Sequence, residues 1–291
     1  MKIKHHAKTI SLPDYLTKYS DLRTSLSDFY VKTRNCKIIG IADEAISGKG
    51  FLLADMGAVT EVLFIAAEND NASVKKALLN YLKGKLPAGS TIQWRIVDNP
   101  VNETLALEYG FRCGNTLNIF HSVDRDNEQA DKILQDYDKL YTFMERRGYR
   151  TVSFDELSED ELLQIRNNPD GEFDSYLRPG ALMDDKLGGF SGKLSSASIR
   201  DGKVAAYTII RNSDGNVCIF EIICVAESER KNGTFILPFL RSFREMKDSG
   251  AKSALFAVYD TNSEMLKIVK KRFSGLIASQ SIQHNMVYLV R

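Results

Sequence analysis

Residues 220–243, FEIICVAESERKNGTFILPFLRSF, decide the fold of this chain. The stretch opens with an apolar run typical of a strand and ends with apolar residues at helical spacing; a polar loop with one glycine, Gly233, lies between. In such a turn the backbone N–H groups of residues 230–234 can converge on one point, where the helix dipole adds positive potential. The pattern predicts a phosphate or pyrophosphate site, although many similar turns bind nothing.

The composition limits the class of protein. The chain has 291 residues, 43% of them hydrophobic, which suits one large or two modest domains, and we expect two. Its net charge of +1 provides no field that would attract nucleic acid or a membrane surface. The sequence has no apolar run as long as a membrane span, and its polar N-terminus does not resemble a signal peptide. We therefore expect a cytoplasmic protein without nucleic-acid or membrane partners.

The cysteines and histidines show no metal-binding spacing. The four cysteines form no C-x-x-C pair, and the four histidines do not lie at ligand spacing from them. Cys218 and Cys224 fall on one expected strand about 20 Å apart, which is too far for pairing. We expect reduced cysteines and no bound metal.

The first half of the chain predicts a mixture of helices and strands. Helices are expected over 11–35, 72–82 and 102–109, and strands over 38–41, 51–54, 59–67 and 91–97. The charged segment 124–148 predicts a helix that links two domains.

The second half repeats this plan. Helices are expected over 158–166, after Gly233 and over 262–272, and strands over 149–154, 194–200, 203–211, 217–225 and 253–259, with a closing pair of strands within 277–290. The segment 167–192 is long and irregular, as binding loops often are. The fold class expected is α/β, with a mixed, largely antiparallel central sheet flanked by helices.

Residues 61–66 align with residues 221–226, acid on acid and apolar on apolar, which indicates a duplicated domain. In the first copy the loop that begins at Glu68 is shorter by a residue or two, carries acids, and has neither glycine nor a base. Because acids repel phosphate, the first copy is expected to have lost the anion site. We expect a degenerate domain over 1–123, a linker helix over 124–148 and an anion-binding domain over 149–291.

Two motifs resemble those of a known family. Val225, Arg230 and Gly233 match the V-x-x-x-x-R-x-x-G-x-G loop with which the GNAT N-acetyltransferase superfamily binds acyl-CoA, although Phe235 replaces the last glycine. Residues 99–111 are similar to the C-terminal GNAT signature, with Asn99, Leu105, Gly110 and Phe111 in register and Ala106 where many members carry a catalytic tyrosine. The chain thus resembles a tandem GNAT protein with a degenerate N-terminal copy.

This resemblance implies an acyl-CoA-dependent N-acyltransferase that transfers an acetyl group from acetyl-CoA, its cosubstrate, to a primary amine. In family members the end of the central strand pairs with the pantetheine arm, the following loop binds the pyrophosphate, and an asparagine at the start of the next helix lies near the pantetheine. The implied binding residues are Ile223, Cys224, Val225, Arg230, Lys231, Asn232, Gly233, Thr234, Phe235 and Asn262.

Glu221 is the candidate general base, because it lies where the family often keeps its base. A strand period of two places it on one face with Ile219 and Ile223, where it is the single charge. Apolar neighbours would raise its pKa and make it a better base, whereas a salt bridge to a nearby Lys or Arg is the structural alternative. Tyr259 is the candidate acid, since Val269 stands at the usual tyrosine position.

A non-catalytic alternative also fits the sequence. Phe235 and the missing tyrosine favour a GNAT scaffold that binds CoA as a regulator or serves as an interaction module. The acceptor is open: an amino acid, a polyamine, a peptide amine or an antibiotic would each suit. The sequence is compatible with a monomer or a homodimer.

Overall fold

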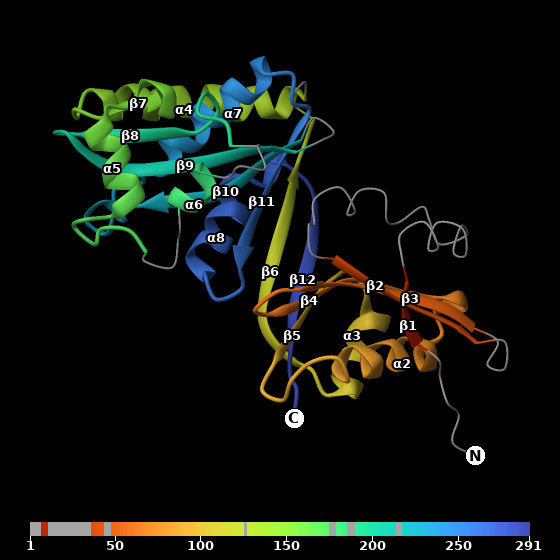
Figure 1. Cartoon of the computed structure of the whole chain (residues 1–291). Coiled ribbons are helices and arrows are strands. Elements are labelled where there is room, and N and C mark those ends of the chain that lie inside the picture. The colour runs from red at the N-terminus through yellow and green to blue at the C-terminus, as the bar shows by residue number, and fades with distance from the viewer. Residues whose placement is uncertain are drawn as a thin grey trace. The chain divides into compact units, whose positions relative to one another are not determined.

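The chain divides into two compact units. A computed structural model describes residues 7–10, 36–43, 48–124, 127–174, 179–184, 190–213 and 217–291. The first unit comprises 1–117 and 282–291, and the second comprises 118–281 (Figure 1). The helix expected over 11–35 lies outside the described residues.

The first unit is a sheet with helices packed against it. Its strands and helices are β1 (Ala7–Ile10), β2 (Cys36–Asp43), β3 (Gly48–Met56), β4 (Thr60–Ala67), α2 (Ala72–Lys83), β5 (Thr91–Val97), α3 (Pro100–Tyr109) and the start of β6 (Arg112–Ser122). The strands follow the order β1-β2-β3-β4-β5, and β5 then pairs with the end of β12 (Ile277–Leu289). This last pairing is antiparallel and runs from Gln283 opposite Val97 to Leu289 opposite Thr91.

Helix α2 shows how the sequence builds this unit. Asn71 caps the helix, because its side-chain oxygen accepts hydrogen bonds from the N–H groups of Ser73 (3.0 Å) and Val74 (3.3 Å). Val74, Leu78 and Leu82 recur at helical spacing and are buried in the core of the unit. The helix predicted over 72–82 is therefore confirmed.

The second unit holds the rest of the chain. Its elements are α4 (Glu128–Glu145), β7 (Arg150–Ser153), α5 (Glu159–Asn167), α6 (Pro179–Met183), β8 (Ser196–Arg200), β9 (Lys203–Ser213), β10 (Val217–Val225), α7 (Ile236–Asp248), β11 (Ser253–Tyr259) and α8 (Ser263–Arg272). The strand order is β12-β6-β11-β10-β9-β8-β7, where β6 contributes from residue 118 onward and β12 up to residue 281. Helices α4 and α7 lie on one face of β8 and β9, and α5 and α6 lie on the other (Figure 1).

The structure confirms the predicted mixed α/β fold. Parallel pairing joins β4 to β5 and β10 to β11, whereas the hairpins and meanders around them are antiparallel. The hairpin β8–β9 turns at Asp201 and Gly202, both with positive φ, as its two-residue turn predicts. No helix within the described residues is long and apolar enough to cross a bilayer.

Three features differ from the expected organisation. Helix α4 is not a free linker, because Ala130 and Leu134 are buried in the core of the second unit. The closing pair of strands is one long strand, β12, whose residues from Ile282 onward belong to the first unit. Strand β6 was not predicted.

Candidate active site

The site begins where β10 and β11 part. The two strands pair in parallel only from Val217 opposite Ser253 to Phe220 opposite Phe256. At the next residue, Glu221, the ladder between β10 and β9 has a β-bulge. Bulges bend a strand and increase its twist, so β10 stays paired with β9 but leaves β11. A cleft opens between the diverging strands.

This cleft has a volume of about 410 Å³ and is lined by both apolar and charged side chains. The apolar lining includes Ile223, Val225, Phe235, Val258, Met265 and Ile268. The polar lining comprises Asp174, Glu221, Arg230, Tyr259, Asn262 and Glu264. The backbone edge of residues 221–225 that faces β11 has no ladder partner in that strand, so it is open to a ligand in the cleft.

The polar loop 226–235 connects β10 to α7 beside this cleft. Gly233 has a φ of +71°, which L side chains rarely adopt, so the turn requires glycine there. Within the loop, the N–H of Arg230 donates to Glu227 (3.4 Å) and that of Asn232 donates to Glu229 (2.9 Å).

The sequence predicted that these two amides bind the anion. That prediction is wrong for them, because each already donates to a carbonyl oxygen within the loop. The N–H groups of Lys231, Gly233, Thr234 and Phe235 donate to no other residue in the described part of the chain. Thr234 is fully buried, and its hydroxyl lacks a partner among the described residues. Helix α7 begins at Ile236, directly after this set of free donors.

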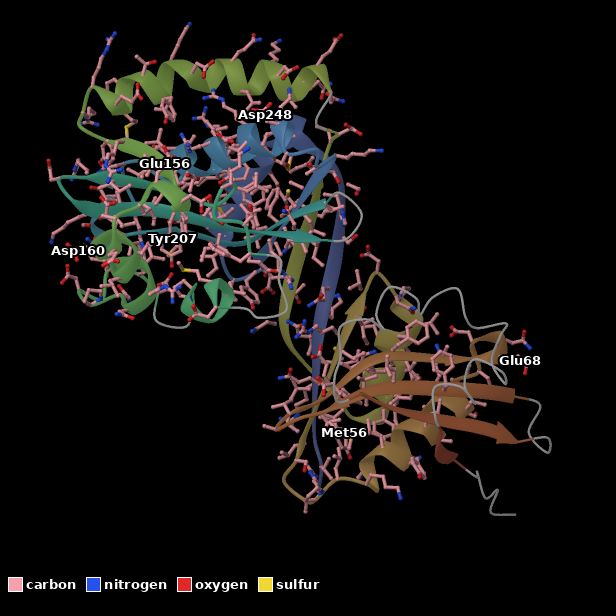
Figure 2. The ribbon with its side chains drawn as sticks, turned by 45° about the horizontal axis from the view of Figure 1, so that its top comes forward. Met56, Glu68, Glu156, Asp160, Tyr207 and Asp248 are labelled. Atoms are coloured by element: carbon pink, nitrogen blue, oxygen red, sulfur yellow. The ribbon has the colours of Figure 1, made fainter. Side chains whose placement is uncertain are left out.

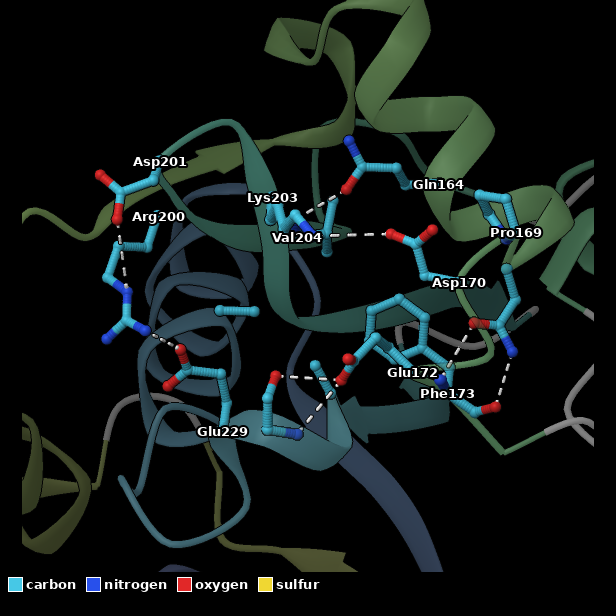
Figure 3. A pocket seen from close by; sticks show the side chains of 14 residues that line it. Gln164, Pro169, Asp170, Glu172, Phe173, Arg200, Asp201, Lys203, Val204 and Glu229 are labelled. Carbon is cyan, nitrogen blue, oxygen red and sulfur yellow. Dashed lines mark hydrogen bonds and ion pairs between the residues drawn. The ribbon is translucent and has the colours of Figure 1, made fainter.

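A buried carboxylate fixes the shape of the loop. Glu229 accepts hydrogen bonds from the hydroxyl of Tyr149 (2.6 Å) and the amide of Asn232 (2.7 Å), and it forms an ion pair with Arg200 (2.7 Å). Burial and the Glu229 carboxylate raise the pKa of Tyr149, which keeps its hydroxyl a donor. Figure 3 shows Arg200 reaching Glu229 at the edge of a separate cavity of about 260 Å³.

The segment after α5 holds the loop from the other side. The Oε2 atom of Glu172 accepts hydrogen bonds from the N–H (3.1 Å) and hydroxyl (2.9 Å) of Ser228, and these bonds lower the pKa of Glu172 (Figure 3). Asp174 forms an ion pair with Arg230, with 3.1 Å between Oδ1 and Nη2. The irregular segment predicted to contribute to binding therefore supplies one residue, Asp174, to the lining of the cleft.

Glu221 lines the cleft but already has a partner. Its Oε1 lies 2.5 Å from Nη2 of Arg211 on β9, which is the salt bridge that the sequence left open as the structural alternative. The bulge also changes the faces of β10: Phe220 packs in the core with α7, whereas Ile222 packs in the core with α5. The uniform face predicted from a period of two is wrong, because the extra residue shifts the alternation by one.

Hydroxyl groups that could serve as an acid occupy different environments. Tyr259 lines the cleft and is 43% exposed. Tyr207 is fully buried inside the second unit, where burial raises its pKa (Figure 2). Its cross-strand neighbour Cys224 lines the cleft, and burial raises the pKa of its thiol. Val269, at the position of the usual tyrosine, is buried in the core.

The structure brings most of the sequence-predicted residues to this cleft. Lining it are Glu221, Ile223, Cys224, Val225, Arg230, Phe235, Tyr259 and Asn262, whereas Lys231, Asn232, Gly233 and Thr234 form the adjoining loop. Asn262 also caps α8, because its Oδ1 accepts from the N–H of Met265 (3.1 Å). Two further residues of the cleft, Asp174 and Glu264, were not predicted from the sequence. For Asp174 the one sequence signal was its position in a long irregular segment.

The first unit repeats the strand divergence but not the loop. Strands β4 and β5 pair only as far as Val62 opposite Trp94, and the bulge follows at Leu63. Leu63 therefore corresponds to Glu221, and the alignment of Glu61 with Glu221 is off by two residues. Only residues 68–71 separate β4 from α2, whereas residues 226–235 separate β10 from α7. The loop of the first unit is therefore shorter by more than the one or two residues that the sequence predicted.

No group of three or more His, Cys, Asp or Glu side chains in the described residues could hold a metal ion. No family model matches the sequence, and no curated protein sequence matches it.

Solved structures do resemble the chain. A tandem GNAT protein from the clavulanic acid biosynthesis pathway, without AcCoA, is 10% identical, covers 99% of both chains and has a TM-score of 0.64. A GCN5-related N-acetyltransferase from Sphaerobacter thermophilus is 10% identical over 88% of this chain and 81% of that chain, with a TM-score of 0.59. A GNAT-family acetyltransferase from Colwellia psychrerythraea is 12% identical over 96% and 99%, with a TM-score of 0.55.

Proposed function

From the tandem GNAT fold of this chain, we propose that it is an acyl-CoA-dependent N-acyltransferase with its working site in the second unit. The proposed reaction transfers an acetyl group from acetyl-CoA to a primary amine. The observation that carries this proposal is the cleft between β10 and β11, which adjoins a glycine loop and the N-terminus of α7. We further propose that the first unit has lost this activity, because residues 68–71 provide no such loop.

The binding roles follow from the free backbone groups. The open edge of residues 223–225 suits the amides of a pantetheine arm, which would add to the sheet as a strand does. The unengaged N–H groups of Lys231, Gly233, Thr234 and Phe235 and the start of α7 suit the pyrophosphate. Arg230 supplies a cation at the cleft, where it can pair with a phosphate oxygen.

The chemistry requires two proton transfers. Acetyl-CoA supplies the thioester; the amine nitrogen forms a bond to its carbonyl carbon, and the carbon–sulfur bond breaks. Glu221, in the cleft at the bulge, is proposed to accept the proton of the attacking amine. Tyr259, exposed on the same cleft, is proposed to give a proton to the leaving sulfur. The Arg211 ion pair holds the Glu221 carboxylate in place.

Acetyl-CoA titration by calorimetry tests the binding site. The substitution Gly233→Ala places a side chain at a φ of +71° and should weaken acetyl-CoA binding by at least about fivefold, since the loop must rearrange. Gly250→Ala is the matched control, because Gly250 also has a positive φ and open space around it but lies beyond the other end of α7. Equal effects of the two substitutions, or no binding to the unmodified protein, would contradict the proposal.

Two observations favour a non-catalytic CoA-binding scaffold as the second candidate. Val269 offers no hydroxyl at the usual tyrosine position, and Glu221 is held by Arg211. Turnover with a panel of primary amines, followed by chromatographic detection of CoA, separates the candidates. Enzyme action predicts that Glu221→Gln lowers kcat by about 10²-fold or more while acetyl-CoA binding is retained. If the protein binds acetyl-CoA but acetylates none of the amines, the non-catalytic scaffold is the remaining candidate.

A further inference from the structure

A cysteine, a histidine and a glutamate meet in the first unit, whereas every residue that lines the cleft belongs to the second. Cys113 lies on β6, His284 on β12 and Glu103 on α3. The Sγ atom of Cys113 is 3.8 Å from Nδ1 of His284, and Nε2 of His284 is 3.8 Å from Oε2 of Glu103. Thr116 places its hydroxyl 3.2 Å from the same Nδ1. The imidazole therefore has a thiol and a hydroxyl on one side and a carboxylate on the other.

The backbone brings these groups together. An added Cβ at Gly114, next to Cys113, would lie only 3.3 Å from the carbonyl oxygen of Asn285, next to His284. A glycine at this place lets β6 and β12 approach closely. The thiol is exposed, whereas Cys218 and Cys224 are buried. An external reagent can therefore reach Cys113 without unfolding of the chain.

The arrangement determines the direction of proton transfer. The negative charge of Glu103, 3.8 Å from Nε2, favours the tautomer with the proton on that nitrogen. Nδ1 is then a lone-pair acceptor that faces the thiol and the Thr116 hydroxyl. When Nδ1 takes the thiol proton, the imidazolium lies between a thiolate and a carboxylate, and both stabilise it. Within the described residues, the printed contacts join the thiol to His284 from β12 and, through the imidazole, to Glu103 from α3.

We propose that Cys113 is a reactive thiol that exchanges with small external disulfides, with His284 as its base and Glu103 as a positioning residue. The thiolate attacks one sulfur of the disulfide and forms a mixed disulfide with Cys113. The other half leaves as a thiolate and takes up the proton held by His284. One cysteine sulfur is oxidised and the leaving half is reduced, so the reaction needs no further oxidant. The proposal does not depend on acyl transfer.

The magnitude follows from thiol chemistry. A free thiol with a pKa near 8.5 is about 1% thiolate at pH 6.5. Complete proton transfer to an imidazole would raise that fraction about 100-fold. Since the nucleophilicity of a thiolate falls as its basicity falls, the net gain in exchange rate is about 10-fold.

The test measures exchange with 2,2′-dithiodipyridine on the full chain in a Cys36→Ser background, with peptide mass spectrometry to identify the modified cysteine. At pH 6.5 Cys113 should react about 10-fold faster than glutathione. His284→Asn should remove this advantage, Glu103→Gln should remove part of it, and the rates should converge near pH 10, where every thiol is ionised. His121→Asn, on the same strand as Cys113 but outside the cluster, is the matched control and should react as the unmodified chain does.

Circular dichroism of each variant establishes that it is folded. Two results would overturn the proposal: reaction of Cys113 at the rate of glutathione, or equal rates in the His284→Asn and His121→Asn variants. If His284→Asn fails to fold, the Glu103→Gln rate profile against pH decides, because a purely structural carboxylate would leave that profile unchanged.

Discussion

The ion pair between Asp174 and Arg230 predicts that removal of an acid tightens acetyl-CoA binding. In the ligand-free cleft the Arg230 guanidinium is held 3.1 Å from the Asp174 carboxylate. A phosphate can use that guanidinium only by breaking this pair. The two side chains are 50% and 44% exposed, and exposed pairs of this kind contribute about 0.2–1 kcal/mol. At about 1.4 kcal/mol per tenfold change, Asp174→Asn should lower the Kd of acetyl-CoA about 1.4- to 5-fold.

Calorimetric titration at low ionic strength measures this effect. Asp170→Asn is the matched control: it removes the same charge from the same segment, but Asp170 pairs with Lys203 at 3.7 Å rather than with Arg230. In an Arg230→Ala background the Asp174 substitution should lose most of its effect. Weaker binding by Asp174→Asn, or an equal gain from Asp170→Asn, would refute the exchange of partners.

Three further predictions concern the packing and ionisation of each unit. Met286 has no exposed surface, so Met286→Ala should lower the free energy of unfolding of the first unit by about 2–5 kcal/mol in urea titrations. The control is Leu289→Ala on the same strand: Leu289 is 58% exposed, and its substitution should change that free energy by at most about 0.5 kcal/mol. Tyr149→Phe leaves the buried Glu229 without one donor and should cost the second unit about 1–3 kcal/mol in the same assay; an unchanged midpoint would contradict the role of this hydroxyl. Burial raises the pKa of Tyr109 to about 12. The neutral phenol of Tyr109 should therefore stabilise the first unit fully below about pH 10, and this contribution should be lost as the pH rises through about 12. An absorbance titration of the unmodified chain and of Tyr109→Phe measures the ionisation of Tyr109, and ionisation near pH 10 would contradict the prediction.

The sequence predicts well those parts of the fold that depend on local periodicity. The strand over 217–225 is recovered with the bounds predicted, because an apolar run ended by a polar loop is a local pattern. The helix after Gly233 is also present, although it begins only at Ile236. Pro238 then lies in the first turn, where a backbone N–H has no helical partner, so it does not disturb the helix.

Features that depend on pairing between distant segments could not be predicted. The bulge at Glu221 exists in the ladder with β9, and nothing in the residues of β10 alone indicates which residue is left over. Strand β6 has a mixed sequence whose partners come from the far end of the chain. The contact between Cys113 and His284 spans 171 residues, so no spacing motif could reveal it.

The candidate site was predictable in its backbone and less so in its charges. Val225, Arg230 and Gly233 mark the loop by motif, and the structure places this loop beside the cleft. The ion pairs of Arg230 and Glu221 are tertiary, since Asp174 and Arg211 come from other elements. Because of these ion pairs, Arg230 and Glu221 are already paired before a ligand binds.

The long strand β12 has a consequence for how the protein is made. The free edge of β5 is covered only when residues 283–289 arrive, and Met286 completes the apolar interior there. During synthesis the ribosome has by then translated the whole of the second unit, residues 118–281. The first unit therefore cannot finish folding as it emerges, and it must wait with an uncapped sheet edge while the second is being translated. Cutting the gene between the two copies would leave that edge permanently exposed, which is a route to aggregation.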